Sequence, residues 1–220
     1  MIEKHDEKIL WKITCGVFPS NSYIYQFNGE GIVIDGGLDE EYIMEVISQK
    51  NISITSVYLT HGHFDHAAVA AHCQKKFNCK VYLHRDDLKT MQSSNFLLMA
   101  CGIKKKILLP NATLVDEGVI GDIFGEHVEY HHVPGHTPGS SFIEIGRYIF
   151  TGDSVYANGI GKTGFRSEDF IQLKASLGIK KEVFNKDILI CPGHGRSING
   201  LNIFSSNKEL AQFMENKHEC

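Results

Sequence analysis

The stretch Thr60-His61-Gly62-His63-Phe64-Asp65-His66 places three histidines and an aspartate within six residues. It follows the apolar segment Val57-Tyr58-Leu59 and precedes an alanine-rich helical segment. Neutral imidazole and carboxylate groups are the usual protein ligands of zinc and similar metals. Gly62 allows the tight backbone turn that lets four such groups converge. A solvated loop with Asp65 as a helix cap is the alternative, but the full HxHxDH pattern favours a metal site.

Three further segments carry a histidine or an aspartate directly after an apolar run: Pro134-Gly135-His136-Thr137-Pro138-Gly139-Ser140, Thr151-Gly152-Asp153-Ser154 and Cys191-Pro192-Gly193-His194-Gly195. Strand ends at one edge of a layered fold lie close together. We therefore expect seven groups to converge, which exceeds the needs of one ion and suits two ions with a bridging carboxylate. The seven are His61, His63, Asp65, His66, His136, Asp153 and His194. We expect the other histidines, of which His84 is the strongest competitor, to be structural or solvent-facing.

Composition narrows the class of protein. The chain has 220 residues, 42% of them hydrophobic, and a net charge of −4, which fits an ordinary globular protein and argues against a nucleic-acid partner bound through a basic surface. Six cysteines without a CxxC pair suit free thiols in a reducing cytoplasm. The start of the chain lacks the features of a secretory signal, and no apolar run is long enough to cross a membrane. We expect a cytoplasmic protein with a small-molecule substrate and no membrane partner.

Periodicity predicts strands and helices in both halves of the chain. Strand-rich blocks cover about 10–34 and 113–156, with shorter strands over 56–59, 80–83 and 187–190; helices are expected over 40–50, 67–77, 86–100, 170–184 and 205–218. This pattern suits an α/β fold with two sheets packed together and helices on the outside. No repeat or linker divides it, so we expect a single domain over 1–220.

The four motifs, in this order along the chain, resemble the metallo-β-lactamase superfamily. The resemblance covers nearly the whole chain and implies the αββα sandwich of that superfamily, two mixed β-sheets flanked by helices. By family pattern, the first metal would be bound by His61, His63 and His136. Asp65, His66 and His194 would bind the second, and Asp153 would bridge the two. Zinc is the expected metal, although iron and manganese suit the same ligands.

Within the superfamily, the segments GHTPGS and TGDS and the loop Gly159–Phe165 are most similar to the glyoxalase II hydrolases. That likeness places Lys162 where those enzymes hold the glutathione part of the substrate. Gly164 stands where they carry an aromatic residue, which weakens the inference to glutathione. Glyoxalase II also adds a C-terminal helical region, whereas here we expect one helix after His194. Part of the substrate pocket would then come from loops near Lys162, from residues 86–110, or from another subunit.

The implied reaction is hydrolysis of a thioester or another activated ester. Asp65 is the candidate catalytic residue because it could orient the nucleophile as well as bind metal. No separate general acid is evident, which favours a thiolate leaving group over an amine. Asp35, beyond another apolar strand, is a candidate partner for a ligand histidine, and an ordinary turn aspartate is an equally good interpretation.

Three rival readings stay open. A persulfide dioxygenase with a single iron would use His61, His136 and Asp153 and would leave His66 and His194 without a role. A metal-binding protein without catalysis would keep all seven ligands but show no turnover. A serine hydrolase is the weakest rival, because the sequence contains no GxSxG elbow.

Overall fold

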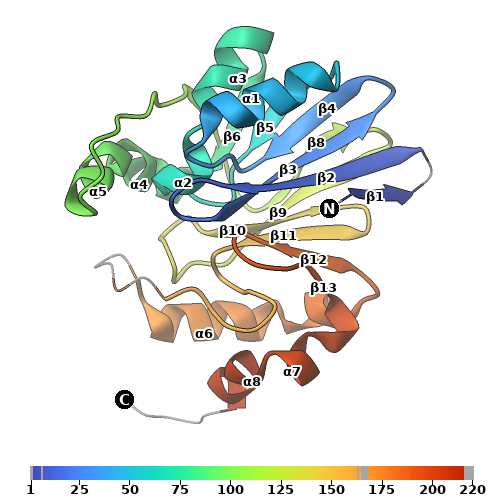
Figure 1. Ribbon diagram of the computed structural model, residues 1–220. Helices are drawn as coiled ribbons and strands as arrows, with labels where there is room; N and C mark the ends of the chain where they lie inside the picture. The colour runs from blue at the N-terminus through green and yellow to red at the C-terminus, as the bar shows by residue number, and fades with distance from the viewer. Residues whose placement is uncertain (1, 6, 163, 165–167, 216–220) are drawn as a thin grey trace. The chain divides into compact units, whose positions relative to one another are not determined.

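The computed structural model describes residues 2–5, 7–162, 164 and 168–215. It divides into two compact units, Met1–Val115 and Asp116–Cys220, and each unit is built on a β-sheet of its own (Figure 1).

The first unit contains a seven-stranded sheet whose strands lie in chain order. They are β1 (Ile2–His5), β2 (Lys8–Cys15), β3 (Ser20–Phe27), β4 (Glu30–Ile34), β5 (Ser53–Tyr58), β6 (Lys80–His84) and β7 (Ala112–Val115). β1 to β4 pair antiparallel and β4 to β7 pair parallel. The switch follows from the connections: the two-residue turn Asn28-Gly29, with positive φ at both residues, closes a hairpin, whereas helical crossovers separate the parallel strands.

Helices α1 (Glu40–Gln49) and α3 (Ala70–Phe77) cover one face of this sheet (Figure 1). Ile43 and Ile47, one turn apart on α1, are fully buried and pack in the same core as Val33 and Val57 of the sheet. The helix predicted over 40–50 is thus present because its apolar residues repeat at helical spacing. Helices α4 (Leu88–Gln92) and α5 (Ser94–Ala100) extend from the unit beyond the end of β6, after the short 3₁₀ helix η1 (Arg85–Asp87).

The prediction of a single helix over 67–77 is wrong about where the helix begins. The structure has a short helix α2 (Phe64–Ala67) and then α3, with a break between them. Gly36 causes this break: its N–H donates to the carbonyl of His66 and its carbonyl accepts from the N–H of Val69. The backbone of Gly36 therefore takes the hydrogen-bonding groups that would have continued one helix.

The second unit contains a six-stranded sheet in the order β13-β12-β11-β10-β9-β8. The strands are β8 (Gly118–Ile123), β9 (Glu126–His132), β10 (Ser141–Ile145), β11 (Tyr148–Gly152), β12 (Leu189–Pro192) and β13 (Ile198–Asn199). β11 and β12 pair parallel and the others antiparallel. The sheet is therefore mixed, as the sequence predicted for both sheets.

Helices α6 (Phe170–Ile179), α7 (Ile203–Ser206) and α8 (Lys208–Glu215) cover one face of the second sheet (Figure 1); η2 (Lys181–Asn185) and η3 (Gly200–Asn202) are short 3₁₀ turns. The continuous helix predicted over 205–218 is wrong at Asn207. The side chain of Asn207 donates to the carbonyls of Tyr156 and Gly159 and accepts from the N–H of Leu210, which ends α7 and caps α8. Residues 216–218 of that prediction lie outside the described residues.

The helices of the described part of the chain are all too short or too polar to cross a membrane. The five cysteines described are free thiols, as expected; Cys220 lies outside the described residues.

Candidate metal centre

The histidine motif of the first unit occupies the loop after β5 and the start of α2. The residues His61, His63, Asp65 and His66 all lie in the interior, each at 8% exposure or less. Nε2 of His61 lies 3.1 Å from Nδ1 of His63, and Nε2 of His66 lies 3.7 Å from a carboxylate oxygen of Asp65. Buried imidazole nitrogens this close, with a carboxylate beside them, form a donor set suited to a divalent cation.

Asp35 braces this loop from the end of β4. Its Oδ2 lies 3.0 Å from Nδ1 of His66, and its two oxygens accept the N–H and the hydroxyl of Thr60 at 2.8 Å each. The Thr60 hydroxyl is also 3.1 Å from Nδ1 of His61. A carboxylate against Nδ1 fixes the ring and leaves Nε2 to face a metal. Asp35 holds a left-handed backbone conformation, φ 55°, which costs a non-glycine residue about 1–2 kcal/mol and which these contacts offset.

Two residues that the sequence did not single out hold the turn between the histidines. The N–H of Gly62 donates to a carboxylate oxygen of Asp87, and the hydroxyl of Ser94 donates to the carbonyl of Gly62 at 2.8 Å. Both Asp87 and Ser94 are fully buried. An aspartate and a serine in a helical stretch give no sequence signal for this role, because the pairing spans 25 and 32 residues.

The second unit brings together the other three predicted ligands. His136 follows β9, Asp153 follows β11 and His194 follows β12. Oδ2 of Asp153 lies 3.3 Å from Nε2 of His194 and 3.9 Å from Nε2 of His136. The parallel pairing of β11 and β12 sets this arrangement, since Gly193 donates to the carbonyl of Gly152 at 2.8 Å. One carboxylate oxygen between two imidazole nitrogens suits a bridging ligand.

Glu168 is a further residue of this second set that the sequence did not identify. Its Oε1 lies 3.5 Å from Nδ1 of His136, and its carboxylate is 3% exposed. Its other oxygen accepts the N–H of Gly164 at 2.8 Å. Glu168 stands to His136 as Asp35 stands to His66: a buried carboxylate faces the Nδ1 side of the ring. It lies in an irregular segment ahead of α6, where a lone glutamate carries no pattern.

Lys162, predicted to bind substrate, forms a salt bridge with Glu209 of α8 and is half exposed. Its role stays a prediction. Thr163 and Phe165 of the same predicted loop lie outside the described residues, and Gly164 has a positive φ of 75°.

Three of the other histidines, His84, His131 and His132, make hydrogen bonds within their own units, and His218 lies outside the described residues. His84 accepts from the N–H of Asp86 and so caps η1. His131 hydrogen-bonds Glu144 at 2.8 Å, and this bond, helped by the nearby Lys186, holds the pKa of the Glu144 carboxyl below its usual range although partial burial opposes the shift. His132 lies 2.9 Å from the carbonyl of Pro138.

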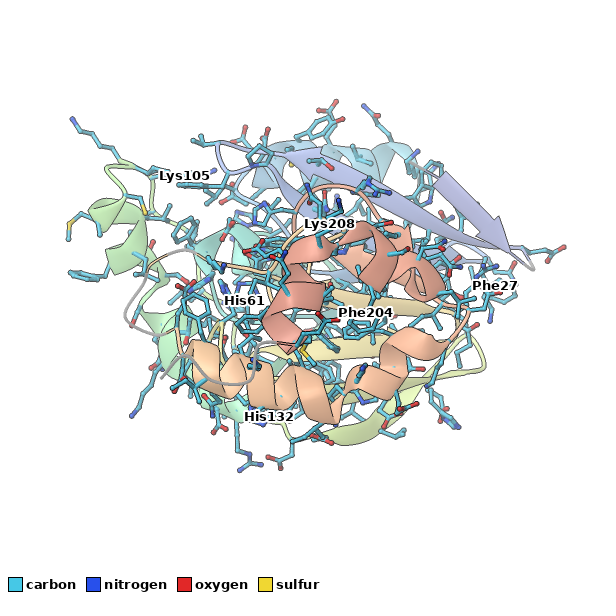
Figure 2. All side chains as sticks on the ribbon, turned by 90° about the horizontal axis from the view of Figure 1, so that it is seen from below. Phe27, His61, Lys105, His132, Phe204 and Lys208 are labelled. Carbon is cyan, nitrogen blue, oxygen red and sulfur yellow. The ribbon has the colours of Figure 1, made fainter. Side chains whose placement is uncertain are left out.

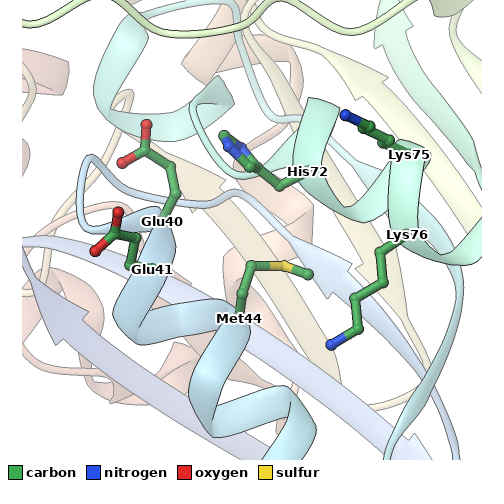
Figure 3. Close-up of a pocket in the computed structure, with 6 residues that line it drawn as sticks. All are labelled: Glu40, Glu41, Met44, His72, Lys75 and Lys76. Carbon is green, nitrogen blue, oxygen red and sulfur yellow. The ribbon is translucent and has the colours of Figure 1, made fainter.

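A separate cavity of about 450 Å³ lies between α1 and α3 in the first unit. Figure 3 draws its six lining residues: Glu40, Glu41, Met44, His72, Lys75 and Lys76. None of them belongs to the histidine motif, so this cavity is not the predicted catalytic site.

Comparison with known proteins agrees with the fold and the motifs. The model of the metallo-beta-lactamase superfamily matches residues 15–194, which spans both units. The hydroxyacylglutathione hydrolase GloC of Haemophilus influenzae is 32% identical over 178 residues, 79% of this chain and 84% of that protein.

Two solved structures are similar along most of their length. A protein described as BLEG-1 B3 metallo-beta-lactamase has a TM-score of 0.79 at 24% identity, covering 94% of this chain and all of that one. TTHA1623, solved in a di-iron-bound form, has a TM-score of 0.77 at 26% identity, covering 90% of this chain and 98% of that one. The two structures confirm the α/β fold class, and the match to the superfamily model over residues 15–194 confirms the family resemblance that the motifs carried.

Proposed function

Because the chain belongs to the metallo-β-lactamase superfamily, we propose that this hydrolase cleaves thioesters in the manner of glyoxalase II. The main support for this proposal is the set of candidate metal ligands. One unit has a buried HxHxDH loop, and the other has a carboxylate between two imidazole rings. Similarity to a hydroxyacylglutathione hydrolase supports the substrate class. The substrate is thus a small molecule.

In the proposed enzyme these seven residues would serve a binuclear site, as the family pattern implies. His61, His63 and His136 would hold the first ion, Asp65, His66 and His194 would hold the second, and Asp153 would be a ligand shared by both. Zinc is the default, and the di-iron form of TTHA1623 makes iron the first alternative to test. Bound divalent ions supply Lewis acidity to a carbonyl oxygen and lower the pKa of water to about 7.

The residues of this chain supply the remaining steps. Asp35 and Glu168 orient the imidazoles of His66 and His136 from behind, so that neither ring has to reorganise during turnover. Asp65, beside His66, orients the attacking water and accepts its proton. The carbonyl carbon gains the oxygen of water, its bond to sulfur breaks, and the thiolate leaves with the electron pair. A thiolate needs little acid assistance, so the mechanism requires no separate general acid.

The test is to replace His63 or Asp153 with alanine in the full chain and to measure bound metal by elemental analysis. Hydrolysis of S-lactoylglutathione and of a generic thioester panel is measured alongside. We expect both variants to lose metal and turnover, whereas His127→Ala, at an exposed position, keeps both.

Unchanged metal content and hydrolysis in His63→Ala and Asp153→Ala would refute the site. A wild-type protein with one iron per chain and oxygen uptake on glutathione persulfide would replace the hydrolase with the dioxygenase. Two bound ions without turnover on any thioester or ester would leave a metal-binding protein.

A further inference from the structure

An arm of the first unit, residues 94–110, is fixed to the histidine motif and is called here the α5 arm. The hydroxyl of Ser94 donates to the carbonyl of Gly62, between the two motif histidines. Phe64 of the motif packs with Leu98 and Ile107 of the arm in a small apolar core. Helix α5 contacts α2, which carries the second half of the motif, and Figure 1 shows α4 and α5 at the same side of the unit as α2. The motif and the arm therefore keep a fixed position relative to one another.

The outer surface of the α5 arm is apolar. Phe96 and Met99 are each 65% exposed and Leu108 is 56% exposed. Phe96 and Met99 are three residues apart on a helix, so they lie on one face. Asn95 exchanges two hydrogen bonds with the backbone of Ile107, at 2.9 and 3.1 Å, which holds Leu108 alongside the start of α5. Phe96 and Met99 thus share one exposed face of α5, and Leu108 is exposed in the segment that Asn95 connects to the start of that helix.

The same arm carries three consecutive lysines. Lys105 is a tether, because its ammonium group contacts the carbonyl of Leu38 and the carboxylate of Glu40; Figure 2 labels it beside this arm. Lys104 and Lys106 are exposed and make no ion pair or hydrogen bond within the described part of the chain. In a protein of net charge −4, these two cations form a local basic patch next to the apolar residues.

We propose that the α5 arm selects thioesters that join an apolar acyl group to an anionic thiol carrier. The proposal rests on the proposed function and deepens it. Phe96, Met99 and Leu108 cover the acyl chain, and Lys104 and Lys106 attract carboxylates or phosphates of the carrier. Both features belong to an arm that contacts the motif through Ser94, Leu98 and Ile107, and the proposal assigns the acyl chain and the carrier of one molecule to that arm.

The charge of the α5 arm favours an anionic thioester over an anionic membrane or a second copy of the chain. An anionic membrane is held by clusters of about 4–8 basic residues, and this arm offers two free lysines. A second copy of the chain would bring its own Lys104 and Lys106 against the same pair, and like charges would oppose that contact.

A stable thioether tests the arm without any turnover. We titrate the full chain with S-octylglutathione and S-methylglutathione and follow binding by calorimetry. Wild type should bind the octyl compound at least about tenfold more tightly, because its chain buries more apolar surface. Phe96→Ser or Met99→Ser should weaken octyl binding about fivefold and leave methyl binding unchanged. These positions are exposed, so the variants should fold.

The lysines are tested by the double variant Lys104→Ala with Lys106→Ala. It should weaken binding of both thioethers, and the loss should shrink in high salt because screening shortens the reach of exposed charges. Ile179→Ser in α6 of the second unit and Lys80→Ala in β6, both at exposed positions outside the arm's residues 94–110, serve as matched controls and should bind like wild type.

Measurements of turnover distinguish the proposal for the α5 arm from the proposal that the protein is a thioester hydrolase. We compare kcat/KM for S-acetylglutathione and S-octanoylglutathione in wild type and in Phe96→Ser. Hydrolysis with the same octanoyl-to-acetyl ratio in both proteins overturns the role of the arm and leaves the hydrolase standing. No hydrolysis by the metal-loaded wild type, with octyl binding still lost in Phe96→Ser, overturns the hydrolase and keeps the ligand class of the arm.

Two further results would overturn the proposal for the arm. One is equal binding of both thioethers with cosedimentation of the protein on phosphatidylglycerol vesicles, which would assign the arm to a membrane. The other is a concentration-dependent dimer that Phe96→Ser abolishes, which would assign it to a second copy.

Discussion

The two units hold their shares of the predicted ligands in different ways. The first unit places four of them on one loop of six residues, and buried contacts from Asp35, Asp87 and Ser94 brace that loop. The second unit places three of them on three separate loops, each after a different strand. A contiguous set is positioned by local backbone and its braces, whereas a dispersed set is positioned by the register of a sheet.

Burial sets one ligand apart from the rest. His136 and Asp153 of the second unit are as buried as His61, at 5% exposure or less, whereas the side chain of His194 is 28% exposed. A ligand held in the interior has few alternative rotamers, while a partly exposed one is replaced more easily by water. Replacement of the buried His61 should therefore cost more activity than replacement of the partly exposed His194.

The largest expected effect compares His61→Ala with His194→Ala. Loss of a metal ligand removes several kcal/mol of transition-state stabilisation, so kcat/KM on a thioester should fall about a thousandfold in His61→Ala. The fall in His194→Ala should be about tenfold smaller, because water can take the place of the exposed ligand. Steady-state kinetics with matched metal loading measures both. A larger loss in His194→Ala would reverse the comparison.

Glycines beside the motifs test how tightly each set is packed. A Cβ at Gly62 would lie 2.6 Å from the backbone nitrogen of Met91, and a Cβ at Gly135 would lie 2.4 Å from the backbone of Leu173. Alanine at either position should lower the free energy of unfolding by about 3 kcal/mol, measured by urea denaturation. Gly178→Ala is the control, since nothing lies within 4 Å of its Cβ. A neutral Gly135→Ala would mean that the dispersed set tolerates movement.

The bracing carboxylates should be equivalent in the two units. Asp35→Asn and Glu168→Gln each remove the charge that faces Nδ1 of a ligand histidine. Each should weaken metal affinity about 10–100-fold, measured by competition with a chelating dye. Asparagine tolerates the left-handed backbone at position 35, so that variant keeps the backbone conformation and removes the charge and one of the two acceptor oxygens. An effect in one unit alone would break the symmetry proposed for the two carboxylates.

The smallest effect concerns Glu144, which lies away from the predicted ligands. Its folded-state pKa is lowered by the hydrogen bond from His131 and by Lys186, so its stabilisation is present above the ordinary pKa of 4.5 and is lost as pH falls through the lowered value. Glu144→Gln should cost about 1 kcal/mol of unfolding free energy at neutral pH and almost nothing in strong acid. Denaturation at both pH values measures this, with exposed Glu182→Gln as the control; a constant cost would contradict it.

The sequence predicted the strands and helices that have a clear period. The helix over 40–50 and the strand over 80–83 are present within a residue or so, because their apolar residues repeat regularly. The breaks were missed. Gly36 interrupts the helix predicted from 67, and Asn207 interrupts the one predicted from 205; both act through hydrogen bonds to distant backbone, which periodicity does not encode.

The candidate site divides in the same way. The ligands of the HxHxDH loop could be predicted from the sequence because they are adjacent in it. Asp35 could be predicted because it is a polar residue just beyond an apolar strand. Glu168, Asp87 and Ser94 could not be predicted, because each contacts its partner from an irregular or helical segment with no recurring pattern. The assignment of ligands to two ions stays a prediction.

The exposed end of α5 also provides a practical tool. Of the cysteines described, Cys101 is the exposed one, directly after α5, whereas burial raises the pKa of the Cys73 thiol to about 12 and leaves it unreactive. An environment-sensitive fluorophore attached at Cys101 would sit next to the apolar face of the α5 arm. Its emission would then report the arrival of an acyl chain in real time, in unmutated protein and before any bond is broken.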